Sequence, residues 1–357
     1  MFDLTPTPVQ SAAVAAVRSI REEVQESAEA INDSGEIPDQ LWSRVADAAQ
    51  ASPSAIADGS SVLLDPVGLT LVAEEIAVGD AGLAFAIIGS ALGNIAVADS
   101  GAVEDGAVLA LYEGFGREPS EYRTVARQDT GGLHVSGRKE SVIHAATAKS
   151  FLVVASVAEG LGIFRVDASA PTATIERDDL KIGTLALGAA RTALVGFDSV
   201  EAERITVPAD RLLRAVAAAR LLLPAISIGA GQAAVDTAAQ WVAGRSVRDA
   251  PLAVNQGVTF PLVDADIALS RGRLLLWDVA SQISACGDLA KLEHRTSRAV
   301  AVGCAAGSTA ARVASNTMGW RGLSQRFPAE QRYRDTSLLA AIDFDPLQHT
   351  IPVLEAV

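Results

Sequence analysis

Arg245 and Gln256 stand out in the C-terminal half of the chain, because a plain amphipathic helix would need neither side chain. They flank Pro251 in the stretch GRSVRDAPLAVNQGVTFPLVDADIAL, residues 244–269. The apolar residues of this stretch recur every three or four positions, which predicts a long helix with one buried face. A guanidinium is a rigid fork of donors that suits phosphate oxygens. The pair therefore indicates either contact with a phosphate-bearing ligand or ordinary surface and helix-capping contacts.

Other residue types that do chemistry lack productive spacing. The histidines are scattered and predict ordinary surface or core positions rather than metal ligands; they are His134, His144, His294 and His349. Cys286 and Cys304 form neither a metal-ligand pair nor a disulfide framework, which indicates a reducing compartment. The sequence GAGQAAV at 229–235 lies within a predicted helix, so it is not a dinucleotide fingerprint. No serine or cysteine nucleophile motif is present.

The composition excludes some partners. A formal net charge of −14 argues against nucleic acid, because phosphate backbones are bound by Lys and Arg. The N-terminus MFDLTPTPVQSAA has no basic or strongly apolar region, so we expect no signal peptide. The apolar run at 214–235 contains arginines and Pro224, which favours a buried helix over a membrane span. We expect a soluble cytoplasmic protein.

The period of the apolar residues divides the chain into three parts. Residues 8 to about 110 have helical spacing, with a first helix over 7–31 and a break at Gly79 and Asp80. From about 108 to 206 the period changes to two, in short β-branched segments separated by Gly, Asp or Ser. Helical spacing returns from Pro208 to about 340. We expect an N-terminal helical domain at 1–107, a middle β domain at 108–206 and a C-terminal helical domain at 207–357.

Several motifs, in this order, resemble the acyl-CoA dehydrogenase family over nearly the whole chain. They are LVAEEIAVGDAGLA at 71–84, SGRKESVIHAATAKSFLVVAS at 136–156, VGFDSVEAERI at 195–205 and AEQRYRD at 329–335. A further family pattern is matched by Arg245, Pro251, Leu252, Gln256, Leu262 and Asp264, with Asp249 in place of a glycine. The resemblance implies an α+β fold: a helical N-terminal domain, a middle antiparallel β-barrel or sandwich, and a C-terminal four-helix bundle.

In that family FAD lies between two subunits, and the neighbour supplies an arginine, a glutamine and a glycine-rich turn. By position the resemblance assigns the first two roles to Arg245 and Gln256. The turn corresponds to Asn316, Gly319, Trp320 and Gly322, with tryptophan at the middle glycine. A helix C-cap with a packed tryptophan is the alternative for this turn.

The half of the site that would hold the chain's own flavin ring departs from the family. The hydroxyl-bearing turn reads YEGFGREP at 112–119, in which only Glu113 is kept. Ser141 and Ile143 replace an aromatic residue and a threonine. Buried heteroatoms of a flavin need polar partners, and each unpaired group costs about 1–3 kcal/mol.

The catalytic base is also altered. The family reaction removes a proton from the α-carbon and a hydride from the β-carbon, so it needs a carboxylate at the α-carbon. One family position for that glutamate is Ala219 here, followed by Arg220. The other is Asp343, followed by Phe344 in place of glycine. Aspartate is one methylene shorter, so Asp343 is either a displaced base or a solvated or capping carboxylate.

The resemblance therefore implies the non-catalytic subunit of a heteromeric, α2β2 acyl-CoA dehydrogenase of bacterial sterol or lipid catabolism. A homologous subunit would supply the glutamate, the substrate would be an acyl-CoA, and an electron-transfer flavoprotein would accept the electrons. Two alternatives remain open: a self-sufficient homotetramer that uses Asp343, and a non-enzymatic binding or scaffold protein, since fold alone does not fix function.

Overall fold

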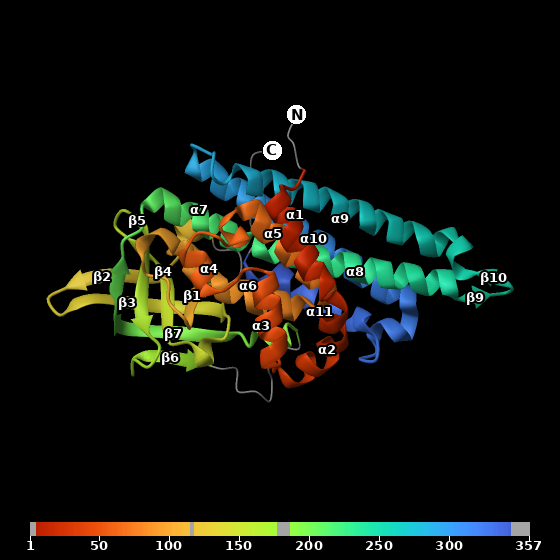
Figure 1. Cartoon of the computed structure of the whole chain (residues 1–357), viewed down its shortest axis with the longest axis horizontal. Helices are drawn as coiled ribbons and strands as arrows, with labels where there is room; N and C mark the ends of the chain where they lie inside the picture. The colour runs from red at the N-terminus through yellow and green to blue at the C-terminus, as the bar shows by residue number, and fades with distance from the viewer. Residues whose placement is uncertain (1–4, 115–117, 177–185, 344–357) are drawn as a thin grey trace, which may run out of the picture.

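The computed structural model describes residues 5–114, 118–176 and 186–343, and it has a helical layer, a β sheet and a helical bundle (Figure 1). The N-terminal helices lie in front of the bundle, and the sheet lies at one end of it. Their bounds are α1 (Pro8–Ser19), α2 (Arg21–Ser34), α3 (Asp39–Ala48), α4 (Pro53–Ala57), α5 (Pro66–Gly79) and α6 (Ala81–Ala96). The predicted order of helices, strands and helices is confirmed.

Local side chains set where the N-terminal helices begin and end. Thr7 and Gln10 form a capping box at the start of α1. Asp80 ends α5 and caps α6, because its carboxylate accepts a hydrogen bond from the Leu83 amide at 2.6 Å. The predicted continuous helix over 7–31 is wrong: the chain breaks at Ile20, which has φ −109°, and a second helix starts at Arg21.

The middle part is one twisted sheet of eight strands, ordered β6-β7-β3-β2-β4-β5-β8 with β1 added beside β4. The strands are β1 (Ala107–Ala110), β2 (Val125–Asp129), β3 (Gly132–Val142), β4 (Ser150–Val157), β5 (Gly160–Asp167), β6 (Ala173–Glu176), β7 (Ala193–Glu201) and β8 (Glu203–Ile205). The expectation of a wholly antiparallel β domain needs correction, because β1 and β2 both pair parallel with β4. Other strands and short 3-10 turns lie between β1 or β2 and β4 in the sequence, so no hairpin turn dictates the direction of these pairs.

The C-terminal part is a bundle of long helices. Its members are α7 (Ala209–Arg220), α8 (Leu222–Gly244), α9 (Gln256–Gln282), α10 (Leu289–Met318) and α11 (Pro328–Ile342). A hairpin of β9 (Ser246–Val247) and β10 (Ala250–Pro251) projects from the end remote from the sheet (Figure 1). The helix predicted over 244–269 therefore begins only at Gln256, and Val254 is 68% exposed rather than buried. Arg248 and Asp249 turn the hairpin with φ of 53° and 63°.

Small residues let α8 and α10 approach closely. A Cβ on Gly307 would lie 2.1 Å from the backbone carbonyl oxygen of Ser227, and one on Gly231 would lie 2.8 Å from Gly307 Cα. Both distances are far inside van der Waals contact, so the crossing needs glycine on each helix. The high alanine content of the chain serves this kind of packing.

Replacing Gly307 with alanine is expected to lower the free energy of unfolding by about 1–3 kcal/mol, because the added methyl group forces the two helices apart. Chemical denaturation of the full chain measures this change. Gly272→Ala in α9 is the matched control, because its Cβ would meet nothing closer than 3.4 Å. That variant should be neutral or gain up to about 1 kcal/mol from helix propensity. Equal losses in both variants would contradict the close-crossing explanation.

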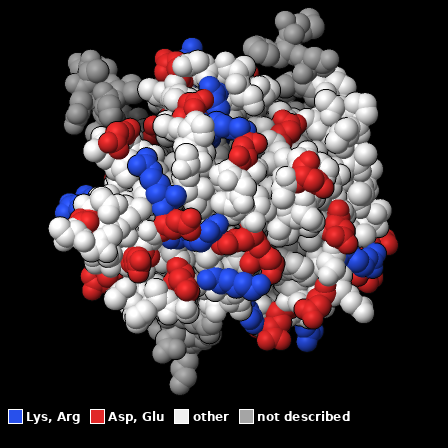
Figure 2. All heavy atoms as spheres, turned by 60° about the vertical axis from the view of Figure 1, so that its left-hand side comes forward, with Lys and Arg blue, Asp and Glu red and all other residues white. Residues whose placement is uncertain are grey.

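One helix in the described part of the chain, the continuous segment 209–244, is long and apolar enough to cross a membrane by length and composition alone. Of its most apolar window, 83% is buried inside the molecule, as expected for the core helix of a bundle. On the face seen in Figure 2, Lys and Arg side chains lie among Asp and Glu side chains and form no basic patch.

Candidate functional site

A buried ion pair joins Arg220, the last residue of α7, to Asp343 at the end of α11. Arg220 Nε donates to Asp343 Oδ2 at 2.7 Å, and both side chains are at most 2% exposed. The guanidinium also donates to Ser297 Oγ at 2.9 Å and lies 3.4 Å from Glu118 Oε2. Burial raises the pKa of the Asp343 carboxyl, and the Arg220 charge opposes that rise. Asp343 is thus neither solvated nor free, which corrects the solvated alternative.

Aromatic side chains enclose this ion pair. Tyr112 and Tyr122 are both 5% exposed, and burial raises the pKa of each phenol well above its usual value. The Tyr122 hydroxyl has no hydrogen-bond partner among the described residues. Burial also raises the pKa of the Cys304 thiol beyond that of a reactive cysteine. The cluster can hold charge, but its carboxylate is engaged by Arg220, whereas a general base must be able to reach the proton it abstracts.

A second buried pair lies beside it in the β domain. Lys139 Nζ donates to Glu113 Oε1 at 2.7 Å and to the Leu111 carbonyl at 3.0 Å. Glu113 also accepts hydrogen bonds from the amides of Arg123 and Thr124. Although burial opposes it, Lys139 with these donors holds the pKa of Glu113 below its usual value. Glu113, the residue kept from the flavin-binding turn, is therefore engaged within this chain; residues 115–117 of that turn lie outside the described residues.

Ser141 and Ile143 stand at the positions that the resemblance assigns to the chain's own flavin ring. Ile143 is 5% exposed, and its Cδ1 lies so close to α6 that a Cβ on Gly89 would come within 2.0 Å of it. Ser141 has φ 53° and bears no aromatic ring. An apolar side chain therefore fills the space where the family has a hydrogen-bonding threonine. Phe344, the other altered position, lies outside the described residues.

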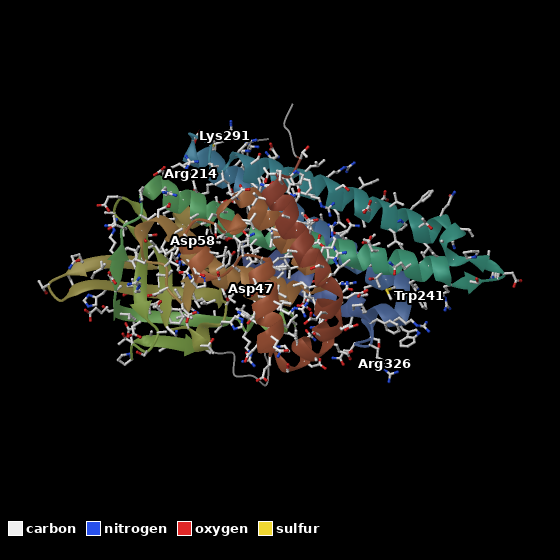
Figure 3. All side chains as sticks on the ribbon, in the orientation of Figure 1. Asp47, Asp58, Arg214, Trp241, Lys291 and Arg326 are labelled. Atoms are coloured by element: carbon white, nitrogen blue, oxygen red, sulfur yellow. The ribbon has the colours of Figure 1, made fainter. Side chains whose placement is uncertain are left out.

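At the opposite end of the bundle, two arginines stack on Trp241 of α8; Figure 3 labels this tryptophan. The Arg321 guanidinium carbon lies 4.6 Å from the centre of the Trp241 ring, and that of Arg245 lies 5.5 Å away. Arg245 is exposed and follows the last residue of α8. Arg321 also stacks on Trp320, which is 67% exposed. This end, here called the aromatic end, carries one exposed arginine, Arg245, and one half-buried arginine, Arg321, both stacked on aromatic rings.

The remaining predicted site residues lie at the aromatic end as well. Gln256 is the first, exposed residue of α9, directly after the cap Asn255. Asn316 is exposed on α10, and its carbonyl accepts a hydrogen bond from the amide of Gly319, which has φ 66°. The backbone of this turn is therefore that of a helix C-cap, which was the alternative to a nucleotide-binding turn. The structure places all four predicted cofactor residues at one end and Asp343 in the buried core.

Sequence reasoning missed a third buried cluster, at the start of α6 and in α11. The Asp335 carboxylate accepts a hydrogen bond from the Leu187 amide at 2.7 Å and is 1% exposed. Gln331 donates to the neighbouring Asp80, and Arg332 is nearly buried nearby. Burial and the Asp80 charge raise the pKa of Asp335 to about 7. The sequence did carry a sign of this cluster. In the run Arg-Tyr-Arg-Asp at 332–335, consecutive charged residues of one helix point in different directions, so some of them must face the core.

Known proteins share both the sequence pattern and the fold. The model of the acyl-CoA dehydrogenase C-terminal domain matches residues 210–343. The mitochondrial short-chain specific acyl-CoA dehydrogenase of Bos taurus is 28% identical over 251 residues, covering 64% of this chain and 57% of that enzyme. The match thus spans less than two thirds of the length of this relative.

Two solved structures extend the likeness to the whole fold. Glutaryl-CoA dehydrogenase of Mycobacterium smegmatis in complex with FADH2 has a TM-score of 0.75 at 17% identity, covering 94% of this chain and 90% of that chain. A steroid ACAD variant has a TM-score of 0.79 at 20% identity, covering 97% and 98%. The C-terminal match, the curated relatives and the shared fold agree: residues 210–343 match the acyl-CoA dehydrogenase C-terminal domain, and the chain as a whole has the fold of acyl-CoA dehydrogenases.

Proposed function

We propose that this chain is one subunit of a heteromeric, FAD-dependent acyl-CoA dehydrogenase of the cytoplasm. A homologous partner subunit supplies the catalytic glutamate and the ring-binding residues. The substrate is an acyl-CoA thioester, for example one with a sterol side chain, and an electron-transfer flavoprotein accepts the electrons. FAD, when bound, would supply the acceptor for the hydride, and this chain would contribute residues that hold the cofactor.

The observation that carries the proposal is the engagement of Asp343 with Arg220 at 2.7 Å. A general base must reach the proton it abstracts within about 2.6–3.2 Å. Asp343 is 3% exposed, and its near oxygen is held by a guanidinium. This speaks against the homotetramer in which Asp343 is the base. It leaves the choice between a subunit that needs a partner and a protein without enzymatic activity.

The aromatic end supports the first choice. Arg245, Gln256, Asn316 and Gly319 are exposed at one place, as residues that contact a flavin of another chain would be. Arg245 would hold the pyrophosphate, because its fork matches two phosphate oxygens and the Trp241 ring fixes its position. The turn at Gly319 would contact the adenosine end.

Flavin binding tests the proposal. The chain purified alone and mixed with excess FAD is expected to lose the flavin on gel filtration, because Ile143 fills the ring site. The complex with its homologous subunit is expected to retain FAD and oxidise an acyl-CoA. Stoichiometric FAD on the isolated chain would contradict the proposal. A complex that forms but never binds flavin would favour the scaffold alternative.

Arg245→Ala is expected to weaken the FAD affinity of the complex by about ten- to a hundredfold, because a charge-assisted contact to phosphate is worth about 1.5–3 kcal/mol. Flavin fluorescence measures the affinity. Arg245→Lys should restore only part of it, since a point charge lacks the two-pronged geometry. Arg326→Ala is the matched control, because Arg326 is exposed at the same end (Figure 3). An equal loss in both alanine variants would show a general charge effect instead.

A further inference from the structure

Helix α9, which runs along one edge of the molecule (Figure 1), has an apolar side that points away from the bundle. Four large apolar residues on this side, here called the outer face, are 42–56% exposed: Phe260, Val263, Ile267 and Leu274. They recur at intervals of three, four and seven residues, so they form one stripe along the helix. The opposite side of α9 is also apolar and is buried in contact with α10, α8 and α5. A helix that is apolar on two sides is typical of one that is covered on both.

The outer face shares no residue with the sites described above. Gln256, which the proposed function assigns to a flavin contact, lies one turn before Phe260 at the start of α9. Single exposed apolar residues are common on any protein surface, whereas several in line on one helix form a patch that marks an interaction site. The charges beside the patch indicate which partner covers it.

Between residues 263 and 274 these charges change sign along the helix. Asp264 and Asp266 lie in the first half of the stripe, and Arg271 and Arg273 lie in the second half. Arg273 is engaged within the chain, because its Nε donates to Glu74 Oε1 at 2.6 Å. Asp264 and Arg271 are both exposed. They are seven residues apart, so they lie along the same edge of the outer face.

This pattern of charges is its own complement. A two-fold axis between Ile267 and Ala268 would make two copies of α9 antiparallel and bring each residue opposite one at the same distance beyond the axis. Asp264 of one copy then faces Arg271 of the other, and the pair occurs twice, as in any contact about a two-fold axis. The apolar residues of the two copies meet between these pairs. An anionic lipid surface is a poorer occupant, because the aspartates beside the stripe would face its negative charge.

We propose that the outer face of α9 is the contact between two copies of this chain, which pack antiparallel and form the Asp264–Arg271 ion pair twice. The contact goes beyond the proposed dehydrogenase function, because it requires neither flavin nor the homologous subunit. In the proposed heteromer the same contact would join two pairs of unlike subunits into one assembly.

Sedimentation velocity of the full chain tests the proposal, and we expect the wild-type chain to be a dimer. Asp264→Arg and Arg271→Asp each turn both ion pairs into like-charge contacts, so each variant alone should dimerise at least about tenfold more weakly. An equimolar mixture of the two variants should recover the dimer, because the mixed dimer again has opposite charges at both pairs. An occupant other than a second copy does not predict this recovery.

Further variants test the apolar part of the contact. Ile267→Asp places a carboxylate at its centre in both copies and should give a monomer. Val9→Asp, at an exposed apolar position of α1, and Asp198→Arg, at an exposed position of β7, are the matched controls and should stay dimeric. An unchanged melting temperature of each variant chain, measured under conditions in which it is monomeric, checks that it folds.

A monomeric wild-type chain would overturn the proposal, and so would a mixture of Asp264→Arg and Arg271→Asp that stays monomeric. A wild-type chain that is monomeric and loses the homologous subunit on Ile267→Asp would assign the outer face to that subunit instead. Retention of FAD by the isolated dimer would contradict the proposed function and leave this contact intact, so the two failures are distinguishable.

Discussion

Replacing Arg220 with leucine is expected to lower the free energy of unfolding at pH 7 by about 3–5 kcal/mol, measured by chemical denaturation. Removing one partner of a buried ion pair leaves the other charge without compensation. Here the carboxylates of Asp343 and Glu118 would both lose their guanidinium. The double variant Arg220→Leu/Asp343→Leu should recover most of the loss, because no charge of that pair then stays buried.

The pH dependence of the Arg220→Leu variant provides an independent check. Without the guanidinium, burial raises the pKa of Asp343 above its unfolded value, so the folded state binds the proton more tightly than the unfolded chain. The loss of stability should therefore shrink as the pH falls from 8 to 5. Arg211→Leu is the control, because the Arg211–Asp99 pair is more than half exposed on both sides and is worth at most about 1 kcal/mol. A loss that does not change with pH would contradict the assignment to Asp343.

Asp335→Asn is expected to stabilise the chain at pH 8 by about 2–4 kcal/mol. The pKa of Asp335 is raised to about 7, whereas an unfolded aspartate has a pKa of about 3.9. Between these values the folded state binds more protons, so wild-type stability falls as the pH rises from 4 to 7. Three pH units at about 1.4 kcal/mol each set an upper value of about 4 kcal/mol.

Asparagine carries no charge and keeps the oxygen that accepts from the Leu187 amide. The variant should therefore lose the downward slope of stability between pH 4 and 7, while Asp198→Asn, at an exposed position on β7, should keep it. Urea denaturation at several pH values measures both. A variant that is less stable than the wild type at pH 8 would show that the Asp335 charge is compensated in the folded state.

Periodicity predicted most of the architecture, because burial on one face imposes a period of 3.6 on helices and of 2 on strands. It failed where the backbone conformation of single residues determines where a helix begins or ends. The interruption at Ile20 leaves the apolar spacing almost unchanged, so nothing in the pattern marks it. The residues before Gln256 also fit a helical period, but the left-handed φ values of Arg248 and Asp249 close a hairpin there. The sequence sign of this turn was Asp249, which stands where the resemblance expects a glycine.

The site was predictable in part for the same kind of reason. The order of the motifs identified Arg245 and Gln256 as candidate cofactor residues. In the structure they lie with Asn316 and Gly319 at the aromatic end. Whether they contact flavin stays a prediction. The partner of Asp343 was out of reach, because Arg220 lies 123 residues away in the sequence and only the tertiary fold brings the two together. The position of Arg220 inside an apolar run was the hint that the sequence offered, because a buried charge needs a partner of opposite charge.

The packing of α5 and α6 against α8 has a consequence during synthesis on the ribosome. Both N-terminal helices are mostly apolar, and they contact α8 in the folded chain. About 125 residues, including the whole β domain, separate the end of α6 at Ala96 from the start of α8 at Leu222. At about 5–20 residues per second, the ribosome needs roughly 6–25 s to deliver that partner. During this interval the nascent chain exposes its most apolar helices, which makes it a client for chaperones that bind emerging polypeptides.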